Sequence, residues 1–311
     1  MPSLKDYIRF YKSESARRKI TKEQLKEINK LYNDLYNQIK KEAKEIAKKS
    51  NYSAGMQKLY LDNFAKRLKN EMGRINKLSG DIVKNGSLKM AEQVVKENES
   101  FLKSLGIEVH GAYSYVPTKA VAQIINGNVY NGKWTLSKAI WGSNQKNIKN
   151  IERIVAEGMA GNKPTAKIAK DLLQYSKSGK SKYNAMRLAR TMTNHAYQKA
   201  FQMTTEKNPF IEAYQWNNGH ADTDVCDLCK ELAETDGFGL GQGIFPKGEV
   251  PMDHPSGYCY ITAITMSRNE IDNALIDWVN DTGDSNMNNA LDEFSKDMGF
   301  LPITVKEKVK K

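Results

Sequence analysis

The stretch from Thr21 to Ile46, TKEQLKEINKLYNDLYNQIKKEAKEI, decides the fold of the N-terminal part of the chain. Its apolar side chains recur every three or four residues, which is the spacing of one face of an α-helix. They are Leu25, Ile28, Tyr32, Leu35, Ile39 and Ile46, with Glu42 interrupting the stripe. Thr21 and Gln24 have the spacing of a capping box, which predicts that the helix begins at Thr21. The stripe is typical of a coiled coil or a long helical hairpin, and equally of a helix that faces an ordinary core.

Further helices are expected in the first third of the chain. A second helical stretch covers about 57–77, and Asn85-Gly86 is typical of a turn after which Ser87 caps a third helix. Residues 1–108 are therefore predicted to form an elongated helical arm, with a coiled coil as one of its possible forms.

Three more regions follow this arm. Residues 109–205 are predicted to be a helical core that starts with a short extended stretch at Tyr113 to Pro117. Residues 206–266 contain two alternating segments, IEAYQWN and YITAIT, which predict strands on either side of a glycine-rich loop. Residues 267–311 begin with a capping box at Ser267 and are predicted to be helices followed by a basic tail. The expected fold is mainly α with a small α+β module near the C-terminus.

The charge of the chain is strongly segregated along its length. The net charge of 311 residues is +12, but residues 1–200 hold 39 Lys and Arg against 17 Asp and Glu, whereas residues 201–311 hold 9 against 19. Such a chain has one region suited to polyanions and another suited to cationic surfaces. A lysine-rich, solvated helical surface gives the same composition, so the charge suggests a DNA partner without establishing one.

Several classes of protein do not fit the composition. No run approaches the roughly 18 apolar residues that a membrane-spanning helix needs, so no membrane partner is expected. The first residues, MPSLKDYIRFYKSESARRKI, carry charges where a secretory signal needs an apolar stretch, so secretion is not expected. The three cysteines are too few for a disulfide scaffold, and a reducing compartment is the default for them.

The cysteines and one histidine form the pattern that carries chemistry. Cys226-x-x-Cys229 is followed, after 24 residues, by His254-Pro-x-x-x-Cys259. A C-x-x-C pair on a tight turn places two thiolates on one side, and the returning His and Cys can complete a tetrahedral zinc site. Because four protein ligands leave no position for water, the pattern predicts a structural zinc ion that stabilises the glycine-rich region.

Other interpretations of these residues stay open. The C-x-x-C pair could be a redox pair, or the three cysteines could be unrelated buried thiols, and His220 is a reserve ligand should His254 not bind. The order of the residues does not fit a zinc deaminase, and there is no H-E-x-x-H segment. No Ser/His/Asp or paired-carboxylate arrangement stands out, so an enzyme is not expected.

One helical segment carries candidate contacts to nucleic acid. Residues 182–201 have a strong helical pattern, along which lie four basic side chains. They are Lys182, Arg187, Arg190 and Lys199. These residues could contact DNA phosphates, although structural pairing with nearby acids is the favoured use of the arginines.

A set of collinear motifs within about 113–265 resembles the phage head morphogenesis family, the minor head proteins of the Mu F type. The motifs are GKWTLSKAIWGSN, EGMAGNKPTAKIAKDL, YNAMRLARTMTNHAYQKAF, WNNGHADTDVCDLC and PMDHPSGYC. Two departures are present. Met192 replaces an acid of the family that could pair with Arg187 or Arg190, and Gly257 stands where the family has the first cysteine of an HP-x-C-x-C segment.

The resemblance implies a low-copy minor capsid protein of a tailed phage. Such a protein would bind the portal inside the head, meet the major capsid or scaffold proteins during procapsid assembly, and influence how packaged double-stranded DNA is retained or delivered. It would reside in the virion, in the capsid interior, after assembly in the host cytoplasm. The alternatives are a zinc-dependent enzyme or effector that acts on nucleic acid, and a plain coiled-coil scaffolding protein.

Overall fold

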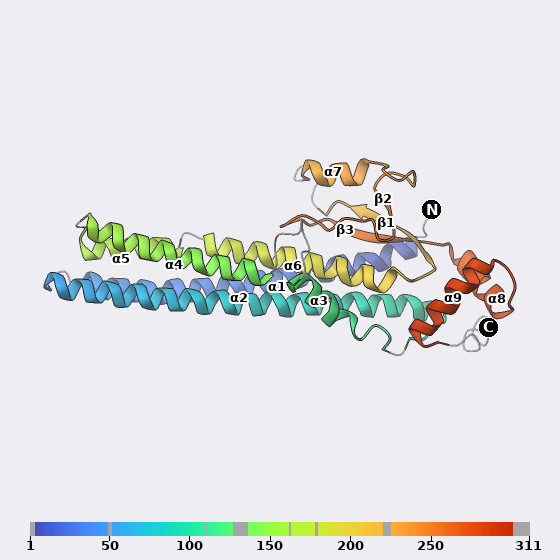
Figure 1. The fold of residues 1–311 in the computed structure, drawn as a ribbon, viewed down its shortest axis with the longest axis horizontal. Helices are drawn as coiled ribbons and strands as arrows, with labels where there is room; N and C mark the ends of the chain where they lie inside the picture. The colour runs from blue at the N-terminus through green and yellow to red at the C-terminus, as the bar shows by residue number, and fades with distance from the viewer. Residues whose placement is uncertain are drawn as a thin grey trace.

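Figure 1 shows the computed structural model, an elongated bundle of helices with a small sheet and shorter helices towards one end. The structure describes residues 4–48, 52–109, 111–126, 136–161, 163–177, 180–219 and 225–300. Its helices are α1 (Leu4–Ala47), α2 (Ala54–Ser104), α3 (Val116–Asn126), α4 (Leu136–Ala160), α5 (Thr165–Lys177), α6 (Lys180–Thr205), α7 (Asp227–Glu234), α8 (Arg268–Val279) and α9 (Ser285–Met298). Its strands are β1 (Ile211–Asn217), β2 (Ile244–Pro246) and β3 (Tyr260–Thr265). The prediction of a mainly helical chain with a small β-containing region near the C-terminus is confirmed.

The bundle is built on the long antiparallel hairpin of α1 and α2, along which α4, α5 and α6 lie (Figure 1). At 1.5 Å per residue the two hairpin helices are about 66 and 76 Å long. One continuous set of buried apolar side chains runs from Ile28 in α1 to Phe300 after α9. The predicted arm, 1–108, therefore shares its core with the predicted helical region, 109–205. No helix in the described ranges combines the length and apolar content needed to cross a bilayer.

The sheet is antiparallel, with strand order β2-β1-β3, and β3 lies against α6. IEAYQWN and YITAIT form β1 and β3 as predicted, whereas β2 lies unpredicted inside the glycine-rich loop. The capping box at Ser267 is also confirmed: its hydroxyl accepts the backbone N–H of Glu270, whose carboxylate accepts the N–H of Ser267. These elements form where the sequence places them because their signals are local.

The predicted start of the first helix at Thr21 is wrong, because α1 already begins at Leu4. Thr21 and Gln24 are buried in the helix interior. The Gln24 amide donates to the carbonyl of Ile82 (3.1 Å) and accepts from the hydroxyl of Thr193 (2.6 Å). Gln24 therefore connects α1 to α2 and α6 instead of capping its own helix.

The predicted turn at Asn85-Gly86 is also wrong, because α2 continues without a break through both residues. A side chain at Gly86 would collide with the amide of Gln24, so this glycine allows α1 and α2 to approach closely. Ser87 does not cap a helix, and its hydroxyl donates to the carbonyl of Val83 within α2 (2.9 Å). The glycine that looks like a turn signal is thus required by packing between helices.

The predicted extended stretch at 113–117 is replaced by a turn that leads into α3. Pro117 lies in the first turn of that helix, where its missing N–H leaves no hydrogen bond unmade. The tyrosines and the proline that favour an extended segment therefore serve a helix start, with Tyr113 buried against the core.

We expect Gly86→Ala to lower the free energy of unfolding by about 1–3 kcal/mol, because it displaces Gln24 and leaves its buried partners unpaired. This loss outweighs the gain of about 1 kcal/mol that alanine gives an exposed helix position. Gly73→Ala in the same helix is the control, since its added methyl group meets only Asn144 at an ordinary 3.6 Å. Gly73→Ala should raise the urea midpoint measured by circular dichroism, and Gly86→Ala should lower it. A change of both midpoints in the same direction would contradict the role of Gly86 in helix packing.

Candidate metal centre

The first pair of candidate ligands lies at the start of a helix and not on the predicted tight turn. Cys226 is the N-cap residue of α7, and Cys229 lies in its first turn. Residues three apart in a helix lie on one face, so the two thiols point to the same side. Cys226 is exposed, whereas Cys229 is only 1% exposed. The pair thus lies at the edge of the core, with one thiol inside and one outside.

The second pair lies on the loop between β2 and β3. Ser256 has a φ of 70°, and the N–H of Gly257 donates to the carbonyl of His254 (2.9 Å), which makes a tight turn. This turn brings His254 and the buried Cys259 back towards α7. A side chain at Gly257 would collide with the carboxylate of Asp253, so the turn needs glycine there.

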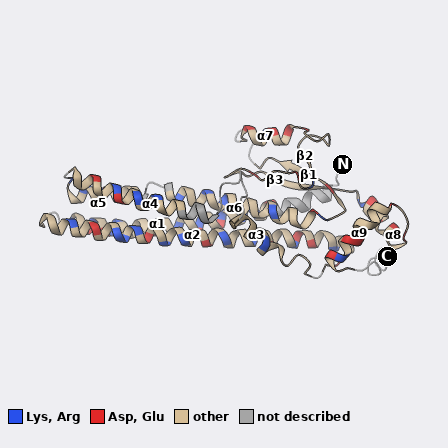
Figure 2. Ribbon diagram, viewed as in Figure 1, with Lys and Arg blue, Asp and Glu red and all other residues tan. Residues whose placement is uncertain are grey.

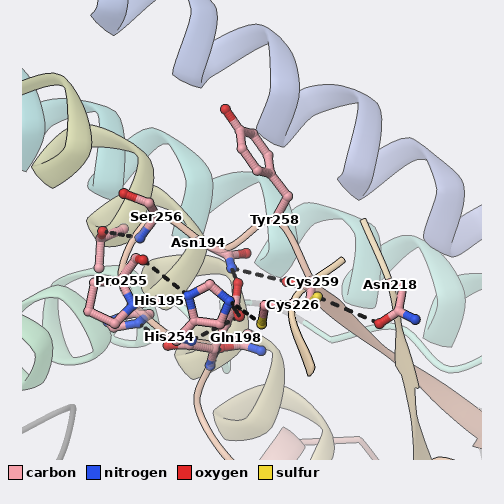
Figure 3. A network of polar contacts seen from close by, with 12 residues as sticks. Asn194, His195, Gln198, Asn218, Cys226, His254, Pro255, Ser256, Tyr258 and Cys259 are labelled. Atoms are coloured by element: carbon pink, nitrogen blue, oxygen red, sulfur yellow. Dashed lines mark hydrogen bonds and ion pairs between the residues drawn. The ribbon is translucent and has the colours of Figure 1, made fainter. Parts of the chain in front are cut away.

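The structure brings all four predicted ligands together in two overlapping groups. The ligand atoms of Cys226, Cys229 and His254 lie within 4.8 Å of one another, and so do those of Cys229, Asp253 and Cys259. The Cys226 Sγ is 3.3 Å from the His254 Nε2 (Figure 3). Tetrahedral zinc with ordinary bond lengths requires about 3.5 Å between sulfur and nitrogen and about 3.8 Å between sulfurs. The cluster can therefore hold a metal ion, with Cys229 common to both groups.

The imidazole of His254 is oriented for metal binding. Its Nδ1 is 3.1 Å from the carbonyl oxygen of Pro255, which can only accept a hydrogen bond. The neutral ring therefore carries its proton on Nδ1 and directs the Nε2 lone pair at Cys226. A carbonyl that fixes the far nitrogen of a histidine in this way is typical of metal-binding histidines.

Asp253 is the member of the cluster that the sequence pattern missed. Its side chain is fully buried and accepts hydrogen bonds from the Asn194 amide (2.6 Å) and the N–H of His254 (2.8 Å). Burial raises the pKa of this carboxyl group to about 6, and the neighbouring His254 opposes part of the rise. The sequence places an acid directly before the candidate histidine, and this was the only signal that could have indicated Asp253. The sequence could not show that Asp253 is buried, because its burial depends on α6. A cysteine at position 257 would collide with the carboxylate of Asp253, which lies where its side chain would begin.

Two of the three thiols, those of Cys229 and Cys259, are buried and have raised pKa values. Burial raises the pKa of Cys229, and its contacts with Cys259 and Cys226 raise it further. Burial also raises the pKa of Cys259. A reactive redox thiol needs a lowered pKa, and neither of these two buried thiols has one. A divalent cation would stabilise these thiols as thiolates in spite of their burial.

The four predicted nucleic-acid contacts do not form one patch. All lie on α6, where Arg187 is exposed and the other three are half-buried. At 100° per residue Lys199 lies on the side of the helix opposite Arg190. The Arg190 guanidinium lies 5.8 Å from the centre of the Tyr258 ring, and none of the four forms an ion pair with a described residue. The favoured pairing of Arg187 and Arg190 with acids is therefore not seen in this part of the chain.

The remaining histidine of this region has a structural role. His195 is buried, and its Nε2 lies 2.8 Å from the carbonyl of Asp253, to which it donates. Burial lowers the pKa of His195, which keeps the ring neutral near pH 7. The reserve ligand His220 lies outside the described residues.

Comparisons with protein-family models, with curated proteins and with solved structures find no match to this chain. The membership in the head morphogenesis family therefore stays a prediction that rests on the collinear motifs alone. The geometry of the cysteine and histidine cluster stands independently of it.

We expect Cys229→Ala to abolish stoichiometric binding of Zn²⁺ or Co²⁺, because this thiol belongs to both ligand groups. Leu228→Ala is the matched control, since Leu228 lies in the same turn of α7 but is exposed. Metal content after dialysis and the thiolate-to-cobalt absorption of the Co²⁺-loaded protein are the measurements. Retention of a full equivalent of metal by Cys229→Ala would exclude this centre.

Proposed function

We propose that the chain is a non-enzymatic minor head protein of a tailed phage, which binds the portal inside the head and contacts packaged double-stranded DNA. The observation that carries the proposal is the charge segregation of an elongated molecule. Lys and Arg are distributed along the helices of the bundle, whereas Asp and Glu predominate on α7, α8 and α9 (Figure 2). The motifs that resemble the head morphogenesis family support the same role.

In this proposal the metal centre holds structural zinc. Cys226, Cys229, His254 and Cys259 offer three thiols and one imidazole, which is a common ligand set of structural zinc sites. Four protein ligands leave no coordination position for a substrate, which favours stabilisation over catalysis. Asp253 supports the ligand loop through its hydrogen bonds to Asn194 and His254.

The basic bundle is suited to DNA in a manner independent of sequence. The exposed lysines of α1 include Lys22, Lys26 and Lys30, which follow one another at intervals of four residues along the same side of the helix. A rod with lysines along it can lie against phosphates and release their counterions, without reading bases. This fits a protein that meets packaged DNA whatever its sequence.

The acidic end of the molecule is assigned to the portal in this proposal. Residues 201–300 hold 5 Lys and Arg against 18 Asp and Glu, so this end is repelled by DNA. It also exposes apolar side chains on and after α7, namely Leu228, Phe238 and Leu240. Acidic and apolar groups together are suited to a protein surface and unsuited to a nucleic acid.

We expect the full chain to bind duplex DNA with an affinity that falls steeply as salt rises from about 50 to 200 mM. Replacing Lys22, Lys26 and Lys30 together with Gln should reduce the slope of log K against log salt by about 0.9 for each lysine that lay on a phosphate. Fluorescence anisotropy with duplexes of two unrelated sequences is the measurement. Binding that does not change with salt would contradict the DNA part of the proposal.

The matched control removes three exposed lysines from the acidic end. These are Lys207, Lys230 and Lys296, replaced together with Gln. The net charge changes by the same amount in both triple variants, so an effect of net charge alone would weaken both equally. A reduced slope only for the α1 variant supports contact along the bundle.

The virion role predicts that the chain is present at low copy in purified, DNA-filled particles. Mass spectrometry of such particles, compared with empty procapsids from the same preparation, is the measurement. A scaffolding protein would appear in procapsids and be absent from filled particles. That pattern would replace the proposed role with the scaffolding alternative.

A further inference from the structure

Arg17, in the N-terminal half of α1, contacts the loop that carries the metal ligands. Arg17 lies on α1, and its side chain is only 4% exposed. Its guanidinium donates to Glu14 (2.7 Å), to the Asn194 side-chain oxygen (2.6 Å) and to the backbone carbonyl of Tyr258 (2.6 Å). Tyr258 directly precedes the ligand Cys259. The guanidinium thus bonds to the ligand loop as well as to two side chains of the bundle.

Asn194 on α6 connects Arg17 to the cluster from the other side. Its amide nitrogen donates to the backbone carbonyl of Cys259 (3.0 Å; Figure 3) and to the carboxylate of Asp253 (2.6 Å). Its oxygen accepts from Arg17. Asn194 is 2% exposed, so no water competes for these bonds. The Asn194 side chain thus has three partners: Arg17 of α1, and the Asp253 carboxylate and the Cys259 carbonyl on the ligand loop.

We propose that Arg17 and Asn194 couple occupancy of the metal centre to docking of the N-terminal part of α1, so that metal loss releases this part from the bundle. The inference rests on the proposed zinc site. One acceptor of Arg17, the carbonyl of Tyr258, and both acceptors of Asn194 lie on the loop that carries His254 and Cys259. A metal ion bound by these two ligands and by the cysteines of α7 would fix this loop in place. When that loop is not fixed, the buried Arg17 loses the carbonyl of Tyr258, and Asn194, which also accepts from Arg17, loses Asp253 and the carbonyl of Cys259. A buried guanidinium that lacks one of its acceptors favours undocking of this part of α1.

The coupling is reciprocal, because two linked equilibria change each other by the same factor. Arg17 and Asn194 are positioning residues: their bonds are to the carbonyls of Tyr258 and Cys259 and to the carboxylate of Asp253, and not to the four ligand atoms of the proposed zinc site. Supporting residues of this kind typically change metal affinity by about 10- to 100-fold when they are replaced. Removing the contacts that Arg17 of α1 makes to the loop should therefore weaken metal binding by a factor in this range.

The first measurement uses the unmodified full chain. Hydrogen exchange is followed by mass spectrometry with Zn²⁺ bound, after removal of the metal with a chelator, and after Zn²⁺ is restored. We expect faster exchange in peptides covering 14–24 of α1 without metal, reversed by Zn²⁺. Peptides covering 57–72 of α2, at the opposite end of the bundle, should not change (Figure 1).

The second measurement is Zn²⁺ affinity by competition with a chelating dye. The variant Glu14→Gln/Arg17→Met removes both buried charges together, so that neither is left unpaired. It should bind Zn²⁺ about 10- to 100-fold more weakly. Tyr32→Phe is the matched control, since it also removes a buried hydrogen bond of α1, to Asn76, far along the bundle. Its Zn²⁺ affinity should stay within about twofold of the unmodified chain.

The outcomes separate the two proposals. If the unmodified chain binds no stoichiometric Zn²⁺, the zinc site is wrong and the coupling fails with it. If Zn²⁺ binds but exchange over 14–24 is the same with and without metal, the coupling is wrong and the zinc site stands. Equal Zn²⁺ affinities of the double variant and the unmodified chain would overturn the coupling in the same way.

Discussion

The hydrogen bonds between α6 and Asp253 hold the C-terminal module on the helical bundle. Asn194 donates to the carboxylate of Asp253, Gln198 accepts from its N–H, and His195 bonds to its carbonyl, so every polar group of this residue meets α6. Thr191, one turn earlier, accepts the N–H of Ser256 on the same loop. These bonds fix the part of the loop around Asp253 against α6 and so help to place His254 and Cys259 near α7.

Buried polar side chains also set the register of the bundle. The buried stripe of α1 continues towards the N-terminus with the same three- and four-residue spacing as the apolar stripe, but its members there are polar: Glu14, Arg17, Thr21 and Gln24. An apolar stripe alone tolerates sliding of one helix along another, whereas a polar group must meet its own partner. Gln24 meets α2 where Gly86 leaves space, and Arg17 meets Asn194. The two contacts define how α1 lies against α2 and α6.

A division of roles follows from this architecture. The long helices make an elongated rod whose surface is rich in lysine, while the module near one end is acidic and holds the three cysteines. Burial raises the pKa values of two of them, Cys229 and Cys259. The rod would suit a long polyanion, and the module a protein partner, as the proposed head protein requires. The hydrogen bonds of Arg17 and Asn194 link the two parts, as the proposed coupling between the metal centre and α1 requires.

The sequence by itself determined the features that depend on local spacing. The apolar stripe from Leu25 to Ile46, the strands IEAYQWN and YITAIT, the capping box at Ser267 and the identity of the four candidate ligands all follow from neighbours in the chain. Only the tertiary structure decided the role of Gly86, the interior position of Thr21 and the place of Asp253 in the cluster. Each of these depends on a partner far away in the sequence, as Gly86 does on Gln24, and the pattern of neighbouring residues carries no information about which distant side chain will fill the adjacent space.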